Sequence, residues 1–385
     1  MKILLINKFY YRRGGDCIYT LNLEQLLMKH GHEVAVFAMD YPDNLPSKWS
    51  RYWPWNMGTA DVLTRPFGSR EVRTKFRRLL DDFKPDVVHL NNIHTQLSPV
   101  VAEMAHERGM TVVWTLHDTK LVCPCYTCTR SGQWCEECFV DKKAVIRYRC
   151  MPGGLPGAVI GYLEAKKWNK ERLQRCVDWF LPPSQFMADT CIRGGYDAGK
   201  FHVLCNFIDL GKCKNPKFDK GDYYVFLGRV NEVKGVRTLC RAASQLPYRL
   251  IVIGDGELLP ELKRQYGESG NIEFKGQMQW DDFRPLLEGA RFMVLPAEWS
   301  ENNPLTVIES QSLGTPVLGA RIGGIPELIE DGVSGMTFRS GDVDDLKEKI
   351  QDMMRAEFDY RQISDNAQLR YSSEAYYDRL MDIYR

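Results

Sequence analysis

Two glutamates, Glu301 and Glu309, flank a short polar turn near the C-terminal end of the chain, and a stretch rich in glycine and proline follows them. The apolar run Phe292 to Leu295 predicts a buried strand before this turn, and Pro304 precedes a helical pattern of apolar residues. The start of such a helix binds anions such as a diphosphate, because its first amides have no partner within the helix. Glu309 can then accept two hydroxyl protons of a ribose, and Glu301 can accept those of a sugar. The alternative is a solvated acidic turn with an ordinary surface glutamate.

Two cations lie in the stretch Gly228-Arg-Val-Asn-Glu-Val-Lys-Gly235, directly after a predicted strand. They are Arg229 and Lys234. A fixed guanidinium and a mobile ammonium both suit a diphosphate whose charge grows as it leaves. The alternative is a pair of solvent-exposed cations beside a turn glycine.

His117 follows the apolar strand pattern of Thr111 to Leu116, which places it at the edge of a sheet where ligands bind. A histidine there can hydrogen-bond a sugar hydroxyl or stabilise charge at a reacting carbon, or it can be a structural histidine bonded to a carbonyl.

Gly14 and Gly15 stand where the first strand turns into a helix. Glycines at that place let the backbone approach a ligand, although they also suit a plain tight turn. No side chain stands out as a nucleophile.

Six of the twelve cysteines lie between residues 123 and 150. Four of them form a symmetric set around one Cys-x-x-Cys pair, and four thiolates can close a tetrahedral zinc site. This predicted quartet is Cys123, Cys135, Cys138 and Cys150. A second quartet of Cys125, Cys128, Cys135 and Cys138 stays open, as do reduced thiols without metal, and an iron–sulfur cluster is less favoured. A structural zinc would supply the folding energy that so polar a segment lacks.

The chain has 385 residues, of which 44% are hydrophobic and 26% are charged, so it can form two domains with separate cores. No apolar run approaches the ~20 residues of a membrane-spanning helix. The first residues enter a strand directly, without the layout of a signal peptide. We therefore expect a cytoplasmic protein.

The net charge of +1 hides an asymmetry between the two halves. Residues 1–204 carry 28 Lys and Arg against 21 Asp and Glu, or +7, whereas residues 205–385 carry 23 against 29, or −6. The basic stretch Arg70 to Arg78, with Phe76 inside it and Leu79 beside it, suits an anionic membrane surface or a phosphate-bearing acceptor. A plain solvated helix face is the alternative. Nucleic acid is not expected, because the sequence has no module that reads bases.

Strand-like and helix-like segments alternate along the chain, which predicts parallel sheets covered by helices. Two such sets predict an α/β protein with doubly wound domains at 1–205 and 206–385, a linker at Asn206 to Asp209 and a Cys-rich insertion at about 120–155. A last helix at about 373–385 is expected to return to the first domain. The predicted strands are Lys2–Ile6, Glu33–Phe37, Asp86–Leu90, Thr111–Leu116, Trp179–Leu181 and His202–Leu204, then Tyr223–Leu227, Arg249–Ile253, Asn271–Phe274, Phe292–Leu295 and Pro316–Leu318.

Seven elements in order make the chain similar to the retaining glycosyltransferases of family 4, over nearly its full length. Besides the glutamate pair they are Gly14-Gly15, Gly31-His-Glu-Val34, Thr115-Leu-His-Asp118, Gly228 to Gly235, Gly254-Asp-Gly-Glu257 and Phe274-Lys-Gly276. The resemblance implies the GT-B fold, in which two Rossmann-like domains face each other across a cleft. The first domain then binds the acceptor and the second binds the donor. The cysteine insertion after the His-Asp pair resembles that of a subset of the family.

The resemblance implies a hexosyltransferase that moves a sugar from a nucleotide-diphosphate sugar, with a UDP-sugar favoured, to a growing or lipid-linked glycan, as in surface polysaccharide biosynthesis. It implies catalytic roles, without a catalytic metal, for His117, Glu301, Arg229 and Lys234. It implies donor contacts by Gly14, Gly15, Arg229, Lys234, Asn303, Leu305, Thr306 and Glu309. Such an enzyme would sit in the cytoplasm, in peripheral contact with the inner face of the membrane. The alternatives are a GT-B sugar-nucleotide epimerase and a non-catalytic sugar-nucleotide-binding or zinc-scaffold protein. The glutamate pair and the basic first half favour transfer over the epimerase. A non-catalytic protein is less favoured because the chain keeps Arg229, Lys234, His117, Glu301 and Glu309.

Overall fold

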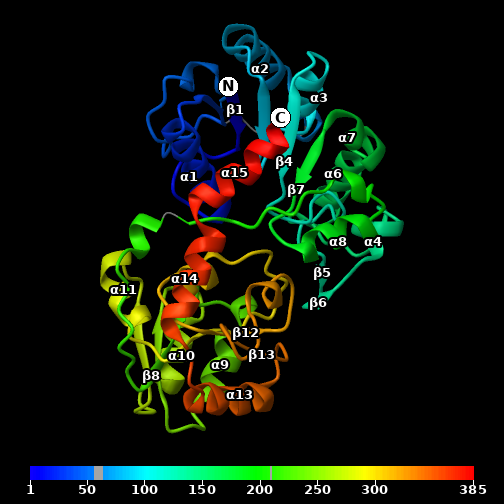
Figure 1. Cartoon of the computed structure of the whole chain (residues 1–385). Helices are drawn as coiled ribbons and strands as arrows, with labels where there is room; N and C mark the ends of the chain where they lie inside the picture. Colours follow the sequence, from blue (N-terminus) through cyan, green and yellow to red (C-terminus); the bar gives the residue numbers. More distant parts are fainter. Residues whose placement is uncertain (56–63, 209) are drawn as a thin grey trace. The chain divides into compact units, whose positions relative to one another are not determined.

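The computed structural model describes residues 1–55, 64–208 and 210–385 (Figure 1). The chain divides into two compact units: unit 1 comprises Met1–Cys205 with Tyr377–Arg385, and unit 2 comprises Asn206–Tyr376. The division falls after Cys205, where the sequence analysis places the domain boundary, although Asp209 of the predicted linker lies outside the described residues. None of the helices in these residues has both the length and the apolar character needed to span a bilayer.

Five parallel strands form the main sheet of unit 1, in the order β2-β1-β3-β4-β7. They are β1 (Lys2–Ile6), β2 (Glu33–Phe37), β3 (Val87–Leu90), β4 (Thr111–Thr115) and β7 (Trp179–Leu181). Both faces of a parallel sheet are covered, which explains the continuous apolar runs of these strands. The predicted strand at His202–Leu204 is wrong. The amides of His202 and Leu204 donate to the carbonyls of Phe180 and Pro182 at 3.0 and 2.9 Å, but Pro182 has no amide with which to extend the ladder.

The helices of unit 1 begin at polar caps in several places. The side chains of Ser69, Asn169 and Ser184 accept bonds from first-turn amides of α2, α7 and α8. The helices outside the insertion are α1 (Gly15–Lys29), α2 (Arg70–Phe83), α3 (Val100–His106), α7 (Lys170–Cys176) and α8 (Gln185–Arg193), with short helices η1 (Ser50–Tyr52), η3 (Arg65–Phe67) and η4 (Ala198–Lys200). The end of the last helix, α15 (Ser373–Tyr384), also belongs to this unit, where the Tyr384 hydroxyl lies 2.5 Å from His89 Nδ1.

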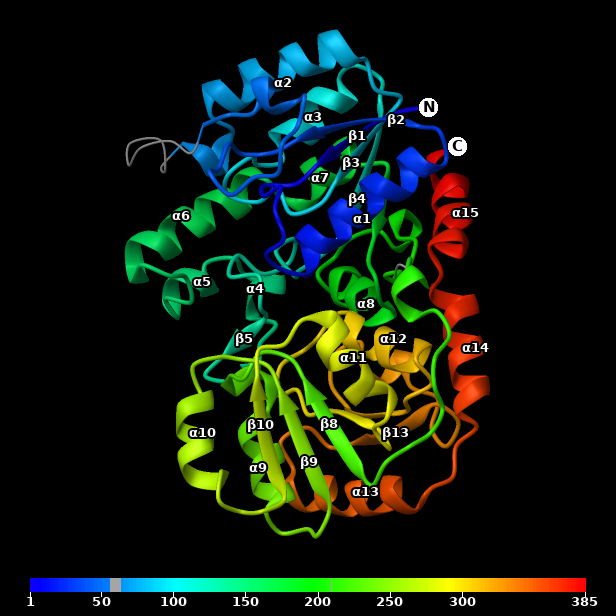
Figure 2. The ribbon, with the colours of Figure 1, turned by 90° about the vertical axis from the view of Figure 1, so that its left-hand side faces the viewer.

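The cysteine-bearing insertion follows β4 and has secondary structure of its own. It contains the hairpin β5 (Thr129–Arg130) and β6 (Gln133–Trp134), then α4 (Glu137–Val140), α5 (Ala144–Arg147) and α6 (Gly154–Lys167). Helices α5 and α6 pack against each other, and Figure 2 shows them side by side at the left of unit 1.

Six parallel strands form the sheet of unit 2, in the order β10-β9-β8-β11-β12-β13. They are β8 (Tyr223–Leu227), β9 (Arg249–Ile253), β10 (Ile272–Gly276), β11 (Met293–Leu295), β12 (Val317–Ala320) and β13 (Gly335–Phe338). The sequence pattern misses β13, because Gly335 and Thr337 interrupt its apolar residues. The chain is thus an α/β protein with two Rossmann-like units, as predicted.

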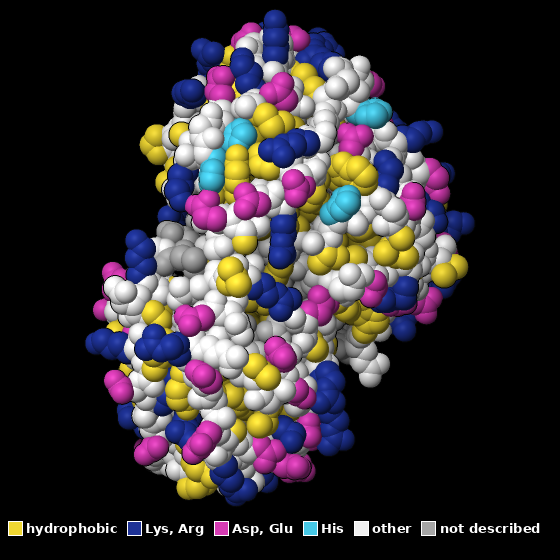
Figure 3. Space-filling view, viewed as in Figure 1, with side chains coloured by type: hydrophobic (Ala, Val, Ile, Leu, Met, Phe, Trp, Pro, Cys, Tyr) yellow, Lys and Arg dark blue, Asp and Glu magenta, His cyan; other side chains and the backbone are white. Residues whose placement is uncertain are grey.

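Helices separate the strands of unit 2. They are α9 (Val236–Ala243), α10 (Leu259–Tyr266), α11 (Trp280–Glu288), α12 (Leu305–Ser312), α13 (Val343–Arg355) and α14 (Tyr360–Tyr371), with short helices η5 (Leu210–Cys213), η6 (Glu232–Lys234) and η7 (Pro326–Leu328). Asp342 caps α13 by accepting bonds from the amides of Asp344 and Asp345. Residues 205–385 carry more acidic than basic side chains, but the face of unit 2 shown in Figure 3 is not uniformly negative. Cationic and anionic side chains are interspersed over it.

Candidate functional site

The loops that follow β8, β9 and β10 meet at the carboxyl edge of the unit 2 sheet. The Val230 amide donates to the Asp255 carbonyl at 2.9 Å, and the Gly254 amide donates to the Gly276 carbonyl at 2.8 Å. A Cβ at Gly254 would lie 1.8 Å from the carbonyl oxygen of Gly228. Glycine is therefore required there by close backbone packing, and the separate glycine motifs of the sequence lie together at the edge where open α/β sheets bind ligands.

Lys234 is positioned by two features of the loop after β8. The Asn231 side chain accepts a bond from the Lys234 amide at 3.2 Å and so caps η6. Gly235 follows with φ +66°, and a Cβ there would lie 1.8 Å from the carbonyl oxygen of Pro296. The loop after β8 is thereby held against the loop after β11.

Lys234 and Glu301, predicted separately from the sequence, form an ion pair at this edge. Their side chains are 26% and 13% exposed, so the pair is only partly screened by water. The indole Nε1 of Trp299 also donates to Glu301 Oε1, at 3.0 Å. The amide of Gly324 donates to the Glu301 carbonyl at 2.7 Å, which fixes the backbone of this residue. A carboxylate held in this way has one oxygen oriented by two donors and can accept further hydroxyl protons.

Glu309 lies in the second turn of α12, whose first helical residue is Leu305. Pro304 precedes the helix without a side-chain cap, so the first amides of α12 have no capping side chain. Burial raises the pKa of Glu309 to about 7, and the nearby Lys212 opposes that rise. The carboxyl group therefore changes its charge near neutral pH.

Two other predicted donor residues have different surroundings. Asn303 is buried and holds Asn206: its Oδ1 accepts from the Asn206 amide at 3.1 Å, and its carbonyl accepts from Asn206 Nδ2 at 3.0 Å. This makes Asn303 a structural anchor of the start of unit 2, and its donor contact stays a prediction. Arg229 is exposed at the end of β8, where a guanidinium can reach an anion in solvent.

His117 lies at the carboxyl edge of the unit 1 sheet, two residues after β4. Its Nε2 lies 3.0 Å from Asn91 Oδ1, and its ring meets that of Tyr19 edge-on at 5.1 Å between centroids. Burial lowers the pKa of His117 to about 4, with the Asp16 carboxylate opposing. The imidazole is neutral near pH 7, so it acts through hydrogen bonds and supplies no positive charge to a reacting carbon. Because an amide oxygen can only accept, the contact with Asn91 Oδ1 fits the tautomer with its proton on Nε2, and in that tautomer Nδ1 is an acceptor.

A polar cluster around His117 was not predicted from the sequence. Asn92 Nδ2 donates to Asp16 Oδ2 at 3.0 Å, and the Asn92 amide donates to Asn7 Oδ1 at 3.0 Å. Within the described residues, the buried atoms Asn91 Nδ2 and Asn92 Oδ1 have no protein partner, so a water or a ligand can bond to them. The signal was present in the sequence as two amides directly after the strand at Val87–Leu90.

Lys8 and Asp118 belong to the same edge. Burial lowers the pKa of Lys8, and the carboxylates of Asp118 and Asp16 oppose that fall. Asp118 accepts a bond from the Lys120 amide at 2.9 Å, as a cap does, and burial raises its pKa. A partly desolvated cation thus lies beside two carboxylates at the edge that carries His117.

Gly14 and Gly15 begin α1, but neither position demands glycine. Gly14 has an extended backbone with φ −150° and ψ −179°. A Cβ at Gly15 would meet nothing within 4 Å, and one at Gly14 would meet only Asp16 Oδ1, at 3.4 Å. The space over these two residues is open to a ligand, and the predicted donor contact stays a prediction.

The cysteine insertion assembles neither of the predicted zinc quartets. Cys123 Sγ lies 3.3 Å from Cys125 Sγ, and hydrogen bonds from Cys125, Cys128 and Cys138 hold the pKa of the Cys123 thiol well below its usual range. Cys135 is not in this group, and Cys150 packs instead against the small cluster around Cys138, with its pKa raised by burial. Within the described residues, no three His, Cys, Asp or Glu side chains are arranged to hold a metal ion together. The tight turns of the segment, with φ near +60° at Tyr126 and +49° at Cys128, bring together cysteines that the linear spacing did not pair.

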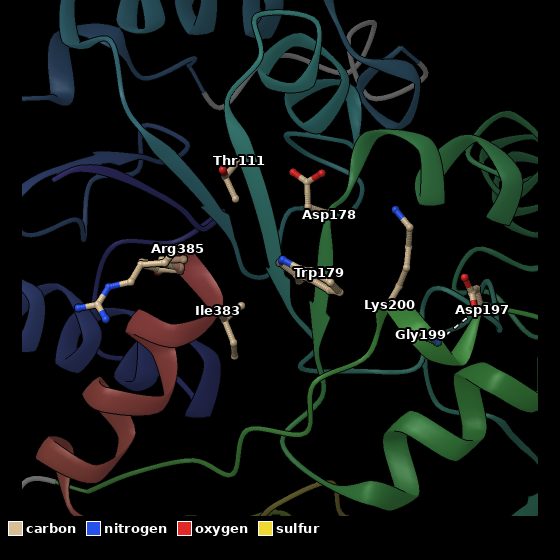
Figure 4. Close-up of a pocket in the computed structure, with 9 residues that line it drawn as sticks. Thr111, Asp178, Trp179, Asp197, Gly199, Lys200, Ile383 and Arg385 are labelled. Atoms are coloured by element: carbon tan, nitrogen blue, oxygen red, sulfur yellow. Dashed lines mark hydrogen bonds between the residues drawn. The ribbon is translucent and has the colours of Figure 1, made fainter.

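The pocket in Figure 4 lies at the opposite edge of the unit 1 sheet. It is lined by the first residues of β4 and β7, Thr111 and Trp179, and by the end of α15. Its polar groups hold neighbouring backbone: Asp178 accepts from the Val112 amide at 2.7 Å, and Lys200 donates to the Val177 carbonyl at 2.7 Å. We therefore assign no sugar-binding role to it.

The chain matches two glycosyltransferase family models. One, described as Glycosyltransferase Family 4, covers residues 13–212, and the other, Glycosyl transferases group 1, covers residues 209–370. An uncharacterized 42.6 kDa protein in the cps region of Klebsiella pneumoniae is 24% identical over 360 residues, which is 85% of this chain and 87% of the relative.

Two solved structures share the fold over almost the whole chain. The lipopolysaccharide outer core galactosyltransferase WaaB matches with a TM-score of 0.69 and 16% identity, over 99% of this chain and 98% of that chain. Anabaena Alr3699/HepE in complex with UDP matches with a TM-score of 0.67 and 18% identity, over 100% and 99%. At these identities the likeness shows the GT-B fold.

Proposed function

Because this chain belongs to glycosyltransferase family 4, we propose that it moves a sugar from a UDP-sugar to a growing glycan or a lipid-linked glycan, with retention of the anomeric configuration. Three relatives support this assignment. The Anabaena structure is a complex with UDP, WaaB is named for the lipopolysaccharide outer core, and the Klebsiella pneumoniae protein is named for a cps region. The acceptor we propose is accordingly a surface polysaccharide or its lipid-linked precursor.

The observation that carries the proposal is the ion pair of Lys234 and Glu301 at the carboxyl edge of the unit 2 sheet. In the absence of donor, the carboxylate balances the lysine charge. When the diphosphate binds, Lys234 turns to the phosphate oxygens together with Arg229, and Glu301 becomes free to accept hydroxyl protons of the sugar. The amides of Leu305 and Thr306 donate to the same diphosphate, as at other helix starts. Glu309 accepts the two ribose hydroxyls in its ionised form.

The chemical step we propose needs positioning and charge rather than a covalent nucleophile. The bond from the sugar carbon to the phosphate oxygen breaks while the acceptor oxygen bonds to the same face of that carbon. The leaving phosphate oxygen takes the acceptor proton, and Lys234 and Arg229 stabilise the negative charge that develops on the diphosphate. These two cations supply the charge that a catalytic metal supplies in other transferases.

Unit 1 is proposed to bind the acceptor. His117 is neutral, so its Nδ1 accepts a bond from a sugar hydroxyl, while the amide groups of Asn91 and Asn92 provide a further donor and acceptor. Such groups select for hydroxyl-rich ligands, because a ligand without hydroxyls would leave them unpaired.

The test is a panel of nucleotide sugars screened for thermal stabilisation, since a ligand at about 100 times its dissociation constant adds about 2.7 kcal/mol to stability. The stabilising donor is then incubated with glycan acceptors, and the anomeric configuration of the product is read by NMR. Retention and strict dependence on an acceptor support the proposal. An inverted product, or an altered nucleotide sugar formed without acceptor, would refute it.

A further inference from the structure

Helix α6, at the end of the cysteine-bearing insertion, carries a stripe of exposed aliphatic side chains. Leu155, Val159 and Leu163 are 45%, 37% and 44% exposed. They are spaced four residues apart, so they lie on one face of the helix. Single exposed aliphatic residues need no explanation, but three on one helix face form a patch.

The orientation of α6 is fixed by buried contacts on its other side. Glu164 pairs with Lys120 at 2.9 Å, and both side chains are almost fully buried. Near the end of the helix, Trp168 Nε1 donates to the Pro66 carbonyl and Lys167 Nζ donates to the Phe67 carbonyl, each at 2.7 Å. Rotating the stripe inward would break a buried ion pair, which is costly. The stripe therefore faces away from the core of unit 1.

Cations precede and follow this stripe along the chain. Arg147 and Arg149 are exposed at the end of α5 and in the turn before α6, and Lys166 is exposed in its last turn. Residues 141–170 contain seven Lys or Arg and two Asp or Glu. Both acids are already paired, Asp141 with Arg147 at 3.4 Å and Glu164 with the buried Lys120. The exposed charge around the stripe is thus positive.

Tyr148, directly after α5, adds an amphipathic group to the segment that packs against α6. It is half-exposed, with the guanidinium groups of Arg130 and Arg147 over its ring at 4.1 and 5.8 Å from the centroid. A ring between cations suits a boundary between water and lipid headgroups.

We propose that this α6 surface docks the protein on an anionic lipid bilayer. It comprises Leu155, Val159, Leu163, Arg147, Arg149 and Lys166. Aliphatic side chains that enter the headgroup layer, with cations beside them for anionic lipids, are the two contributions that bind an interfacial helix. A second copy of the chain fits less well, because a two-fold contact through this surface would place its cations opposite each other.

Helix α2 lacks the apolar part of such a surface. Its cations are present, but Phe76 and Leu79 are fully buried, so α2 offers no apolar group to a bilayer. The cations of α2 can still meet an anionic surface or a phosphate-bearing acceptor, so the sequence-based prediction for Arg70 to Arg78 stays a prediction, with the solvated helix face as its alternative. The binding on α6 needs no sugar transfer, so it can be tested without donor or acceptor.

The experiment is sedimentation of the full chain with vesicles of phosphatidylcholine mixed with phosphatidylglycerol, and with vesicles of phosphatidylcholine alone. The triple variant Leu155→Ser, Val159→Ser, Leu163→Ser should bind the mixed vesicles at least about ten-fold more weakly. The matched control, Val203→Ser, Val333→Ser, Leu369→Ser, removes exposed aliphatic groups elsewhere and should bind as the unchanged chain does. Arg147→Gln, Arg149→Gln and Lys166→Gln should each weaken binding about five-fold at low salt.

Equal binding by the two triple variants would overturn the proposal, as would equal binding of the unchanged chain to both kinds of vesicle. Loss of a dimer in the Leu155, Val159, Leu163 variant, with vesicle binding intact, would assign the surface to a second copy instead and would equally overturn it. UDP titration of the same samples checks that unit 2 is folded. It also separates a failure of the proposed transfer function, seen as no UDP binding by the unchanged chain, from a failure of vesicle binding.

Discussion

Glu309 gives the sharpest test of the donor site, because its charge and its proposed ligand are both specified. Burial raises its pKa to about 7, and only the ionised carboxylate can accept both ribose hydroxyls. The group is neutral below that pKa and ionised above it. Its ionised fraction rises from about 0.1 at about pH 6 to about 0.9 at about pH 8, so the affinity for UDP should rise about ten-fold over this range.

The assay is calorimetric titration with UDP at both pH values for the unchanged chain and for Glu309→Gln. Glutamine keeps the shape of the side chain and does not titrate, so the ratio of the two affinities cancels the protonation of UDP itself. That ratio should grow about ten-fold with pH. Glu309→Ala should lose about 1.5 to 3 kcal/mol at the higher pH, because hydrogen bonds to a charged group are removed.

Two outcomes would refute this reasoning. The first is an equal pH dependence in the unchanged chain and in Glu309→Gln, which would show that the carboxyl charge does not reach the ligand. The second is an unchanged UDP affinity in Glu309→Ala, which would remove the residue from the donor site altogether.

Three further predictions concern charge, metal and backbone. Lys234→Ala should slow sugar transfer by ~10² or more, because the lysine stabilises the leaving diphosphate. The activity of the unchanged chain should survive EDTA, and strict dependence of its rate on added Mg²⁺ or Mn²⁺ would contradict the proposed role of the two cations. If the zinc predicted from the sequence binds, elemental analysis should find it in the unchanged chain and in the control Cys240→Ser, but not in Cys138→Ser. Cys138 is chosen because, within the predicted quartet of Cys123, Cys135, Cys138 and Cys150, its thiol is the one that bonds to the thiol of Cys123. Gly235→Ala should lower the melting temperature more than Gly270→Ala does. Both glycines have positive φ, but only at Gly235 would the new Cβ meet a carbonyl oxygen, at 1.8 Å. Equal losses of stability in the two variants would show that the loop at Gly235 moves to accommodate the Cβ.

Most of the fold could be predicted because it depends on local patterns. The first two strands, Lys2–Ile6 and Glu33–Phe37, have the predicted bounds, since an apolar run between turn residues is sufficient evidence of a buried parallel strand. The errors arose where a distant group decides the outcome. Residues 202–204 run beside β7, but Pro182 cannot extend the ladder, and β13 is held in place by the pairing of Gly335 with Val317 rather than by its own apolar pattern.

The sequence by itself determined the chemical types at the site and the edge at which they lie. Glu301, Lys234 and His117 each follow a predicted strand, and strand ends of a parallel sheet share one edge whatever the order of the strands. That rule places residues on an edge but does not pair them.

Only the tertiary structure decided which groups meet and how they are charged. Lys234 contacts Glu301 across 67 residues because β8 and β11 are neighbours in the sheet. His117 is neutral and Glu309 titrates near pH 7 because burial removes water from them, and burial is a property of the packed chain. The exposed stripe of α6 faces outward for a similar reason, since a buried ion pair on the opposite side of the helix fixes its rotation. Sequence spacing describes contacts within a few residues, whereas pairing, desolvation and orientation depend on contacts between segments that are distant along the chain.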